Sequence, residues 1–272
     1  LRQLSLQKSG LNKTLQDYRN AKSKRKELEF THGETSISDQ EIKDALNKMQ
    51  KALTDDNETQ MAVRQAIKSK IANHQYQNYS VPFELFQNAD DAVFEYAEMQ
   101  AYPVTSNFLN EIELEEQRSQ FHVISNKDTL LFVHWGRAIN YFRGSEGFPG
   151  KERGFHRDLE KMLLMNTSDK QAENQVTGKF GLGFKSVYLI SDKPKILSGR
   201  LGVEIFAAML PEPLQESDRS RLKNRIENSG NTQLTATIIE LPLTEEFNTE
   251  TILKKFNYYA GFLVAFSKTI KH

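Results

Sequence analysis

The stretch Glu84-Leu-Phe-Gln-Asn-Ala-Asp-Asp-Ala92 decides how the chain is interpreted. On a helical repeat, Glu84, Asn88 and Asp91 stand at i, i+4 and i+7, so they share one face. The apolar residues between them fall on the opposite arc. The stretch therefore predicts an amphipathic helix that buries one side in a core and presents a polar stripe on the other.

The polar stripe has the residue types of a catalytic site. Glu84 can act as a general base for an attacking water, and Asn88 can offer its amide oxygen to a hard cation such as Mg²⁺. Asp91, one turn further along, is expected beside the same pocket. Taken alone, however, the segment is more typical of an ordinary amphipathic helix with a solvated acidic face.

A second motif is the glycine-rich run Gly178-Lys-Phe-Gly-Leu-Gly-Phe-Lys185. Glycines permit positive φ and close backbone approach, so successive N–H groups at a helix start can face a phosphate. The spacing is GxxGxG, which is neither the dinucleotide fingerprint nor a Walker motif. A tight helix-entry turn explains the run equally well by itself. Together with the acidic helix, it indicates a nucleoside triphosphate site.

Composition limits the remaining classes. In 272 residues, Lys plus Arg and Asp plus Glu each total 36, so the zero net charge does not indicate nucleic acid or an anionic membrane. The absence of cysteine excludes disulfides and thiolate chemistry. No segment has the apolar length of a membrane span. We expect a cytoplasmic protein and, because the chain opens on Leu1, a fragment of a larger multidomain one.

The pattern along the chain predicts an N-terminal helical extension over residues 1–75 and one α/β domain over 76–272. The glycine-punctuated segment of about 143–183 is typical of a lid or binding loop. The fold class expected is a two-layer α+β sandwich, with a mixed, mostly antiparallel sheet covered by helices on one face. The predicted strands are Thr129–Val133, Lys195–Leu197, Gly202–Met209 and Leu234–Leu241.

The first motif resembles the N-box of the GHKL ATPases, the family of gyrase, heat-shock chaperones, histidine kinases and MutL. The run Thr177–Tyr188 resembles the second glycine box in the version carried by sacsin and its relatives. The resemblance is sharpest over these two motifs and extends loosely from about residue 70 to residue 243. It implies a Bergerat fold that holds Mg-ATP between the N-box helix and the lid.

The resemblance also implies roles for individual residues. Glu84 takes the water-activating position, and Asn88 takes the position of the magnesium ligand. Thr237 matches a late threonine that helps to hold the adenine. Ser168 and Lys170 echo a Ser-x-Lys of sacsin-like lids, although both are equally typical of a surface loop. The implied phosphate contacts come from Gly178, Lys179, Phe180, Gly181, Gly183, Phe184 and Lys185.

The chain departs from the family where the first glycine box, Asp-x-Gly-x-Gly, is expected. It reads His134-Trp-Gly-Arg-Ala138, so His134 replaces the aspartate that accepts the adenine amino group. A missing acceptor for a buried polar group costs about 1–3 kcal/mol. The neutral ring of His134 can accept one hydrogen bond. Trp135 either stacks on the base or belongs to the core, and Gly136 keeps the glycine position of the box.

The leading hypothesis is a Mg-dependent ATPase module whose lid closure drives conformational change in a larger, chaperone-like or defence-type machine. Its expected partners are ATP and either a second copy, in a homodimer, or following domains of the same chain. The alternative is a regulatory or scaffold module that binds nucleotide with little or no hydrolysis. A histidine kinase is a weaker third hypothesis, because no phosphoacceptor helix is identifiable.

Overall fold

The computed structural model describes residues 57–73, 75–163, 183–208, 210–227 and 235–272, together with a few single positions before residue 57. The chain divides into two compact units, Leu1–Ile67 and Lys68–His272. The division falls inside helix α4 (Asn57–Asn73), a few residues before the expected boundary at residue 75. The second unit contains the sheet and the polar helix.

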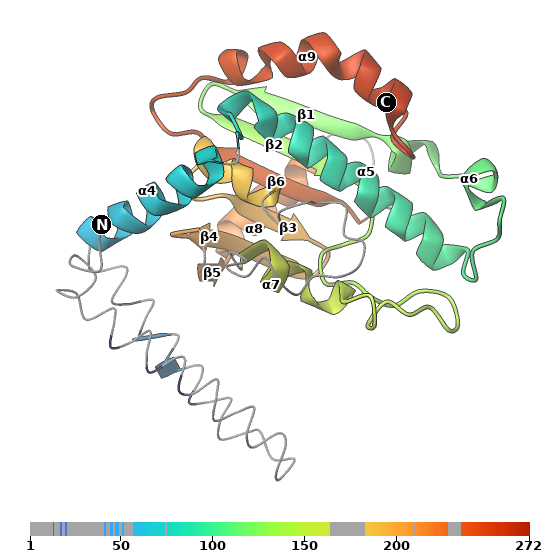
Figure 1. Cartoon of the computed structure of the whole chain (residues 1–272), viewed down its shortest axis with the longest axis horizontal. Coiled ribbons are helices and arrows are strands. Elements are labelled where there is room, and N and C mark those ends of the chain that lie inside the picture. The colour runs from blue at the N-terminus through green and yellow to red at the C-terminus, as the bar shows by residue number, and fades with distance from the viewer. Residues whose placement is uncertain are drawn as a thin grey trace. The chain divides into compact units, whose positions relative to one another are not determined.

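A six-stranded sheet forms the centre of the second unit, in the order β1-β2-β6-β3-β4-β5 (Figure 1). Every pairing is antiparallel, so the sheet is antiparallel throughout where we expected a mixed, mostly antiparallel one. The α+β fold class is confirmed. The strands are β1 (Phe121–Asn126), β2 (Thr129–His134), β3 (Lys195–Ser198), β4 (Leu201–Phe206), β5 (Leu210–Pro213) and β6 (Thr237–Pro242).

The position of β2 in the sheet explains why its sequence is apolar without interruption. Side chains alternate between the two faces of a strand, yet Leu130, Leu131, Phe132 and Val133 are all buried. Both faces of the sheet are therefore covered at this strand, and a strand buried on both faces reads as a continuous apolar run.

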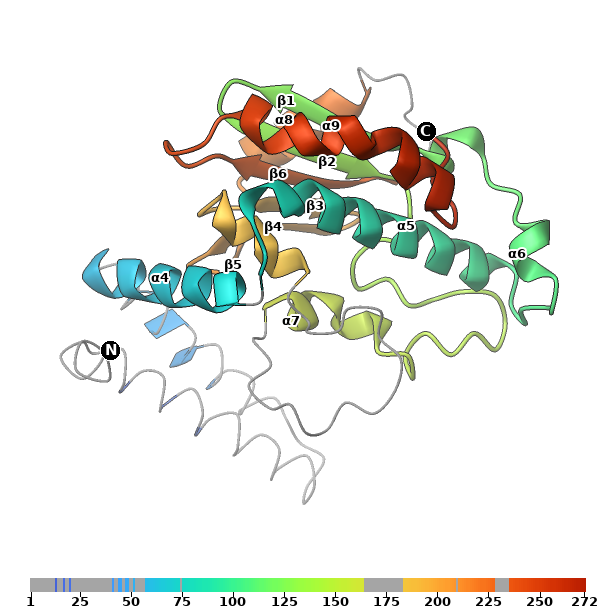
Figure 2. The ribbon, with the colours of Figure 1, turned by 45° about the horizontal axis from the view of Figure 1, so that its top comes forward.

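Helices α5 (Val81–Gln100) and α9 (Thr249–Phe266) cover one face of the sheet and lie side by side (Figure 2). Phe86 of α5 meets Phe121 of β1 edge to face, with ring centroids 5.4 Å apart. Phe256 of α9 completes this aromatic cluster, 6.3 Å from Phe121. The predicted amphipathic helix is thus present, with its apolar arc against the sheet.

The opposite face carries a helix that the sequence analysis did not identify, α8 (Glu216–Glu227). Its Leu222 is buried in a cluster with Leu131 and Val133 of β2. Helices therefore cover both faces of the sheet, whereas we expected them on one face only. The strongly charged sequence of α8 gave no apolar pattern, and among the side chains described in this helix Leu222 is the one apolar residue that is fully buried.

Short elements connect these layers: η1 (Asn78–Ser80), α6 (Phe108–Glu111), η2 (Glu116–Ser119), η3 (Phe155–Arg157), α7 (Asp158–Leu163) and η4 (Phe184–Leu189). The described part of the predicted lid thus contains turns and α7. Among the described residues, no helix combines the length and the apolar character needed to cross a membrane.

Candidate functional site

On the polar stripe of α5, the carboxylate of Glu84 and the amide of Asn88 differ in their exposure to solvent. Leu85 and Ala89 anchor the helix in the core, which leaves Asn88 exposed and Glu84 half-buried. Burial raises the pKa of Glu84 above its ordinary value, because desolvation penalises the charged form. Burial also raises the pKa of the Tyr76 hydroxyl, and the negative charge of Glu84 raises it further. Glu84 is therefore a carboxylate of increased basicity.

The end of the glycine run lies directly on this stripe. A Cβ added to Gly183 would stand 2.8 Å from Oε2 of Glu84 and 3.9 Å from Oδ1 of Asn88. Real Cβ atoms do not come that close to a carboxylate oxygen, so the contact requires glycine at position 183. The structure thus brings together one backbone residue of the second motif and both functional side chains of the first.

The other predicted members of the glycine run and lid lie outside the described residues. These are Ser168, Lys170, Gly178, Lys179, Phe180 and Gly181. Their proposed contacts with phosphate stay predictions.

The helix expected after the glycines is the short 3₁₀ helix η4, which begins at Phe184 and is buried along most of its length. Lys185 within it is almost completely buried. Burial lowers its pKa to about 8, and repulsion from Lys70, in the last turn of α4, adds to the effect. Ser186, next in the chain, has a fully buried hydroxyl without a hydrogen-bond partner among the described residues. Two neighbouring ammonium groups favour an anion in their vicinity.

His134 ends β2 with its ring buried against the α5 layer. Its Nδ1 accepts a hydrogen bond from the Gly136 N–H at 3.2 Å. Burial and the charge of Arg137 lower the pKa of His134 to about 4, so the ring is neutral at neutral pH. Since Nδ1 accepts, the proton resides on Nε2. The acceptor that we expected the ring to offer to a base is therefore used in this internal hydrogen bond.

Thr237 lies beside His134, because these two residues are partners in the β2–β6 register. Its Oγ1 is 2.6 Å from Oγ of Ser198 on β3, and Ser198 also accepts from the Ile139 N–H at 2.9 Å. A row of buried polar groups thus crosses three strands on the face that α5 covers. Ser198 was not predicted as a site residue, because only the strand register places it next to Thr237.

Gly136, two residues after the end of β2, lies close against the backbone of α5. A Cβ at this position would stand 2.5 Å from backbone atoms of Ala92 and Val93. The adjacent Arg137 N–H donates to the Ala92 carbonyl at 2.8 Å. The glycine of the His-Trp-Gly segment is therefore required for packing against the polar helix.

Arg137 was also missed, although it ties three segments together. Its guanidinium pairs with Glu95 of α5 at 2.7 Å and with Asp158 of α7 at 2.6 Å. It also lies 3.8 Å from the centre of the Phe155 ring. Desolvation raises the pKa of Glu95 more than the arginine lowers it, while the two carboxylates raise the pKa of Arg137. The ion-pair geometry is good, and we regard the network as a brace between α5 and the first part of the predicted lid.

Trp135 lies on the other face of the sheet, the one that α8 covers. It is fully buried in the cluster around Leu131 and Leu222, with the His122 ring against it at 4.9 Å. Of the two interpretations of this residue, membership of the core agrees with its position. Its ring exposes no surface on which a base could stack.

Asp90 and Asp91, the two aspartates of the first motif, bind residues 268–270 of the C-terminal segment. Asp91 forms an ion pair with Lys268 at 2.7 Å. Asp90 is buried and accepts three backbone N–H groups, from Lys268, Thr269 and Ile270, at 2.8, 2.8 and 3.1 Å. The Thr269 hydroxyl adds a fourth hydrogen bond at 2.7 Å. Asp91 therefore pairs with the C-terminal segment and its place beside a ligand stays a prediction, while Asp90 has a structural role.

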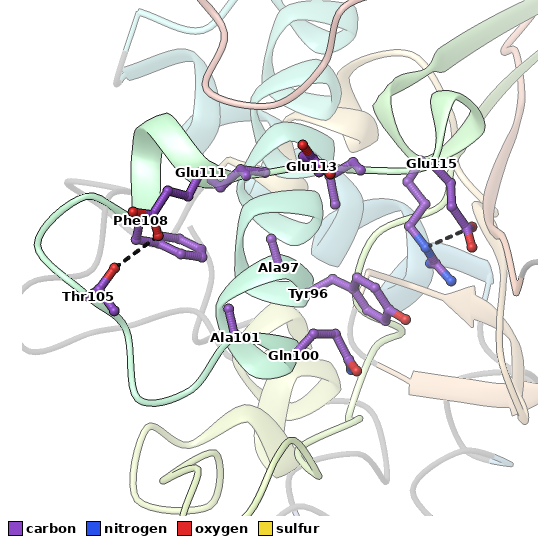
Figure 3. A pocket seen from close by; sticks show the side chains of 12 residues that line it. Tyr96, Ala97, Gln100, Ala101, Thr105, Phe108, Glu111, Glu113 and Glu115 are labelled. Carbon is purple, nitrogen blue, oxygen red and sulfur yellow. Dashed lines mark hydrogen bonds and ion pairs between the residues drawn. The ribbon is translucent and has the colours of Figure 1, made fainter.

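A separate cavity of about 440 Å³ lies along the C-terminal half of α5 (Figure 3). Tyr96 and Phe108 contribute aromatic walls, and Glu111 and Glu113 stand on its rim. The guanidinium of Arg118 lies 4.0 Å from the centre of the Tyr96 ring. None of the predicted site residues lines this cavity, so we treat it as distinct from the site at Glu84.

A metal ion in the candidate site would be held mainly by oxygens of phosphate and water, with few from the protein. The described residues contain no group of three or more His, Cys, Asp or Glu side chains placed to hold an ion. The exposed amide oxygen of Asn88 nevertheless suits Mg²⁺, which usually takes one or two protein oxygens and completes its shell with water and phosphate.

Comparison with known proteins adds one relationship. A family model described as the Sacsin domain matches residues 152–266. This range contains Gly183 and Thr237, while Glu84 and Asn88 precede it. None of the curated proteins matches the chain. The chain is therefore similar to the Sacsin domain over its C-terminal part.

Proposed function

We propose that the chain is a Mg-dependent ATPase module of the GHKL type, with a Bergerat fold. The observation that carries the proposal is the close approach of Gly183, the last glycine of the second motif, to Glu84 and Asn88. Triphosphate hydrolysis needs a phosphate-binding backbone, a base and an amide that can hold Mg²⁺, and in this proposal these three residues belong to those parts. The Sacsin-domain match over the glycine run supports the same interpretation.

In this proposal, Glu84 orients a water molecule and accepts its proton as the water oxygen attacks the γ-phosphorus. The bond to the β-phosphate oxygen breaks, and ADP leaves with inorganic phosphate as the second product. A base with a raised pKa accepts a proton more readily than an ordinary carboxylate does. Asn88 would hold Mg²⁺, which neutralises charge on the β- and γ-phosphates.

Lys185 and Lys70 supply positive charge next to this site. Burial and, after it, repulsion from Lys70 lower the pKa of Lys185, and a triphosphate bound nearby would favour the charged form of this lysine. We expect ATP binding to be coupled to lid closure, and thereby to a conformational change in a larger machine.

The test compares binding and turnover in the wild type and in Glu84→Ala. We expect both proteins to bind ATP in the presence of Mg²⁺, and the variant to lose about 10²–10⁴-fold in phosphate release. Gln87→Ala is the matched control, because Gln87 is exposed on the same helix one turn away. A wild-type chain that neither binds nor hydrolyses ATP would refute the proposal.

A second candidate is a module that binds nucleotide with little turnover, and the His134 ring is the observation that favours it. A donor at Nε2 cannot accept the amino group of adenine, so base recognition differs from the family pattern. Tight ATP or GTP binding by the wild type, with phosphate release no faster than in Glu84→Ala, would select this candidate.

A further inference from the structure

Two buried hydroxyl groups lie together on the face of the sheet that α5 covers. Ser198 ends β3 and Thr237 begins β6, and the two residues are partners in the register of these neighbouring strands. Their hydroxyl oxygens are 2.6 Å apart, and each residue is only 1% exposed. Because β3 and β6 are the two middle strands of the sheet (Figure 1), backbone pairing on both sides fixes the position of this pair.

The hydrogen bonds of the pair leave one hydroxyl proton without an acceptor. Each hydroxyl carries one proton and two acceptor lone pairs. Ser198 Oγ accepts the Ile139 N–H at 2.9 Å, and the other side-chain hydrogen bond of Ser198 and Thr237 within the described residues is the one between them. A single proton serves that bond. The second proton is therefore a buried donor that only a ligand can satisfy.

The Ile139 N–H favours one of the two possible arrangements. A hydroxyl that accepts a hydrogen bond becomes a stronger donor, because the bonds of a chain polarise one another. Ser198 accepts from Ile139 and therefore donates to Oγ1 of Thr237. The proton that remains is the one on Thr237. Ser198 thus fixes both the rotation of the Thr237 hydroxyl and its role as a donor.

The chemistry of this donor suits a neutral acceptor. Neither side chain is charged, and one neutral hydroxyl does not compensate for taking a phosphate out of water. A ring nitrogen or a carbonyl oxygen of a nucleotide base is neutral and needs only one donor. Among the parts of a nucleoside triphosphate, the base therefore matches the pair best.

The position of the pair relative to Glu84 agrees with this choice. Thr237 is the register partner of His134, and Gly136, two residues further on, lies against the backbone of Ala92. Eight residues of helix, a rise of about 12 Å, separate Glu84 from Ala92. A nucleoside triphosphate that spans this distance with its γ-phosphate at Glu84 brings its base to the row that contains Thr237.

We propose that the hydroxyl pair of Ser198 and Thr237 is a donor subsite for the nucleotide base. Thr237 donates to an acceptor atom of the base. Ser198 is a positioning residue, which orients the Thr237 hydroxyl without touching the ligand. The assignment rests on the triphosphate site proposed above and adds to it the group that holds the base.

Calorimetric titration with ATP and with inorganic tripolyphosphate, both in the presence of Mg²⁺, tests the subsite. Tripolyphosphate carries the phosphate chain without a base. We expect Ser198→Ala and Thr237→Val each to weaken ATP binding about 3–10-fold, and to leave tripolyphosphate binding unchanged. Because the two hydroxyls act as one unit, the double variant should bind ATP no more weakly than the weaker of the two single variants.

Ser191→Ala is the matched control, because the Ser191 hydroxyl is equally buried but has no hydrogen-bond partner among the described residues. Its affinity for ATP should equal that of the wild type. Urea unfolding verifies that each variant is folded. If Ser198→Ala does not fold, the loss of ATP binding alone in Thr237→Val tests the subsite by itself.

Three results would overturn the subsite and leave the triphosphate site standing. These are equal losses for ATP and tripolyphosphate, additive losses in the double variant, and a wild type that binds ATP no more tightly than tripolyphosphate. A wild type that binds neither ligand would instead refute the proposed function, and the subsite with it.

Discussion

Gly183 lies against the carboxylate of Glu84, so closely that a Cβ would stand 2.8 Å from Oε2. The two residues belong to separate motifs. Gly183 directly precedes η4, and Glu84 lies in the first turn of α5. Their contact makes the position of the carboxylate depend on the absence of a side chain at residue 183. This relationship gives the most direct test of the site.

Gly183→Ala should therefore impair phosphate release more than stability. The atom it would meet is the far end of a flexible side chain, so the carboxylate can move aside, at a cost of less than about 1 kcal/mol. A displacement of about 1 Å at a catalytic group can cost on the order of 10²-fold in rate. Urea unfolding and phosphate-release assays measure the two effects.

Gly136→Ala is the contrasting substitution. Its Cβ would meet the backbone of α5, which cannot move aside, so we expect a loss of about 1–3 kcal/mol or more in unfolding free energy. Equal stability losses in the two alanine variants would contradict the packing described for both glycines.

Glu84→Gln should stabilise the fold at neutral pH while it abolishes turnover. The folded pKa of Glu84 is raised, so the folded state binds a proton more tightly than the unfolded state does. The carboxyl thus favours folding below its ordinary pKa of 4.5, and this contribution is lost as pH rises through the folded pKa. Urea titrations at pH 4 and pH 7 should show the variant's advantage only at pH 7. An advantage that is the same at both pH values would exclude burial as its cause.

Asp90→Ala should destabilise the chain strongly, while Asp91→Ala should not. Removal of the Asp90 carboxylate leaves the buried N–H groups of Thr269 and Ile270 without acceptors, at about 1–3 kcal/mol for each group. Asp91 makes a partly exposed ion pair with Lys268, of the kind that contributes about 1 kcal/mol or less. Chemical denaturation of both variants distinguishes these roles. Similar losses of unfolding free energy in the two variants would contradict the structural role of the hydrogen bonds to Asp90.

Arg137→Gln should weaken the connection between α5 and the 155–158 segment. The substitution leaves two carboxylates, Glu95 and Asp158, without their buried cation, and we expect a loss of about 3 kcal/mol. Arg153→Gln is the control, because Arg153 pairs with Glu98 in a more exposed position and should cost less than about 1 kcal/mol. Hydrogen exchange should locate the Arg137→Gln effect in α7; unchanged protection there would contradict the brace.

Several elements followed from local pattern. The strand predicted at Thr129–Val133 is β2, and the prediction at Lys195–Leu197 is β3, because apolar β-type runs bounded by turns are reliable signals. Strand β1 and helix α8 were not predicted. Phe121, Val123 and Ile124 of β1 are residues that favour strands and carry a usable signal, whereas the packing of Leu222 of α8 against the sheet is shown by no local pattern.

By itself, the sequence determined the polar and apolar faces of α5, the apolar continuity of β2, and the residue types available for chemistry. Each of these follows from a helical or strand period within a few neighbouring residues. Tertiary structure alone decided that Gly183 lies close to Glu84 and that Asp90 accepts hydrogen bonds from Thr269. It also placed Trp135 on the face opposite His134. These outcomes depend on which distant segments pack together, and the free energy of that packing is a property of the whole core.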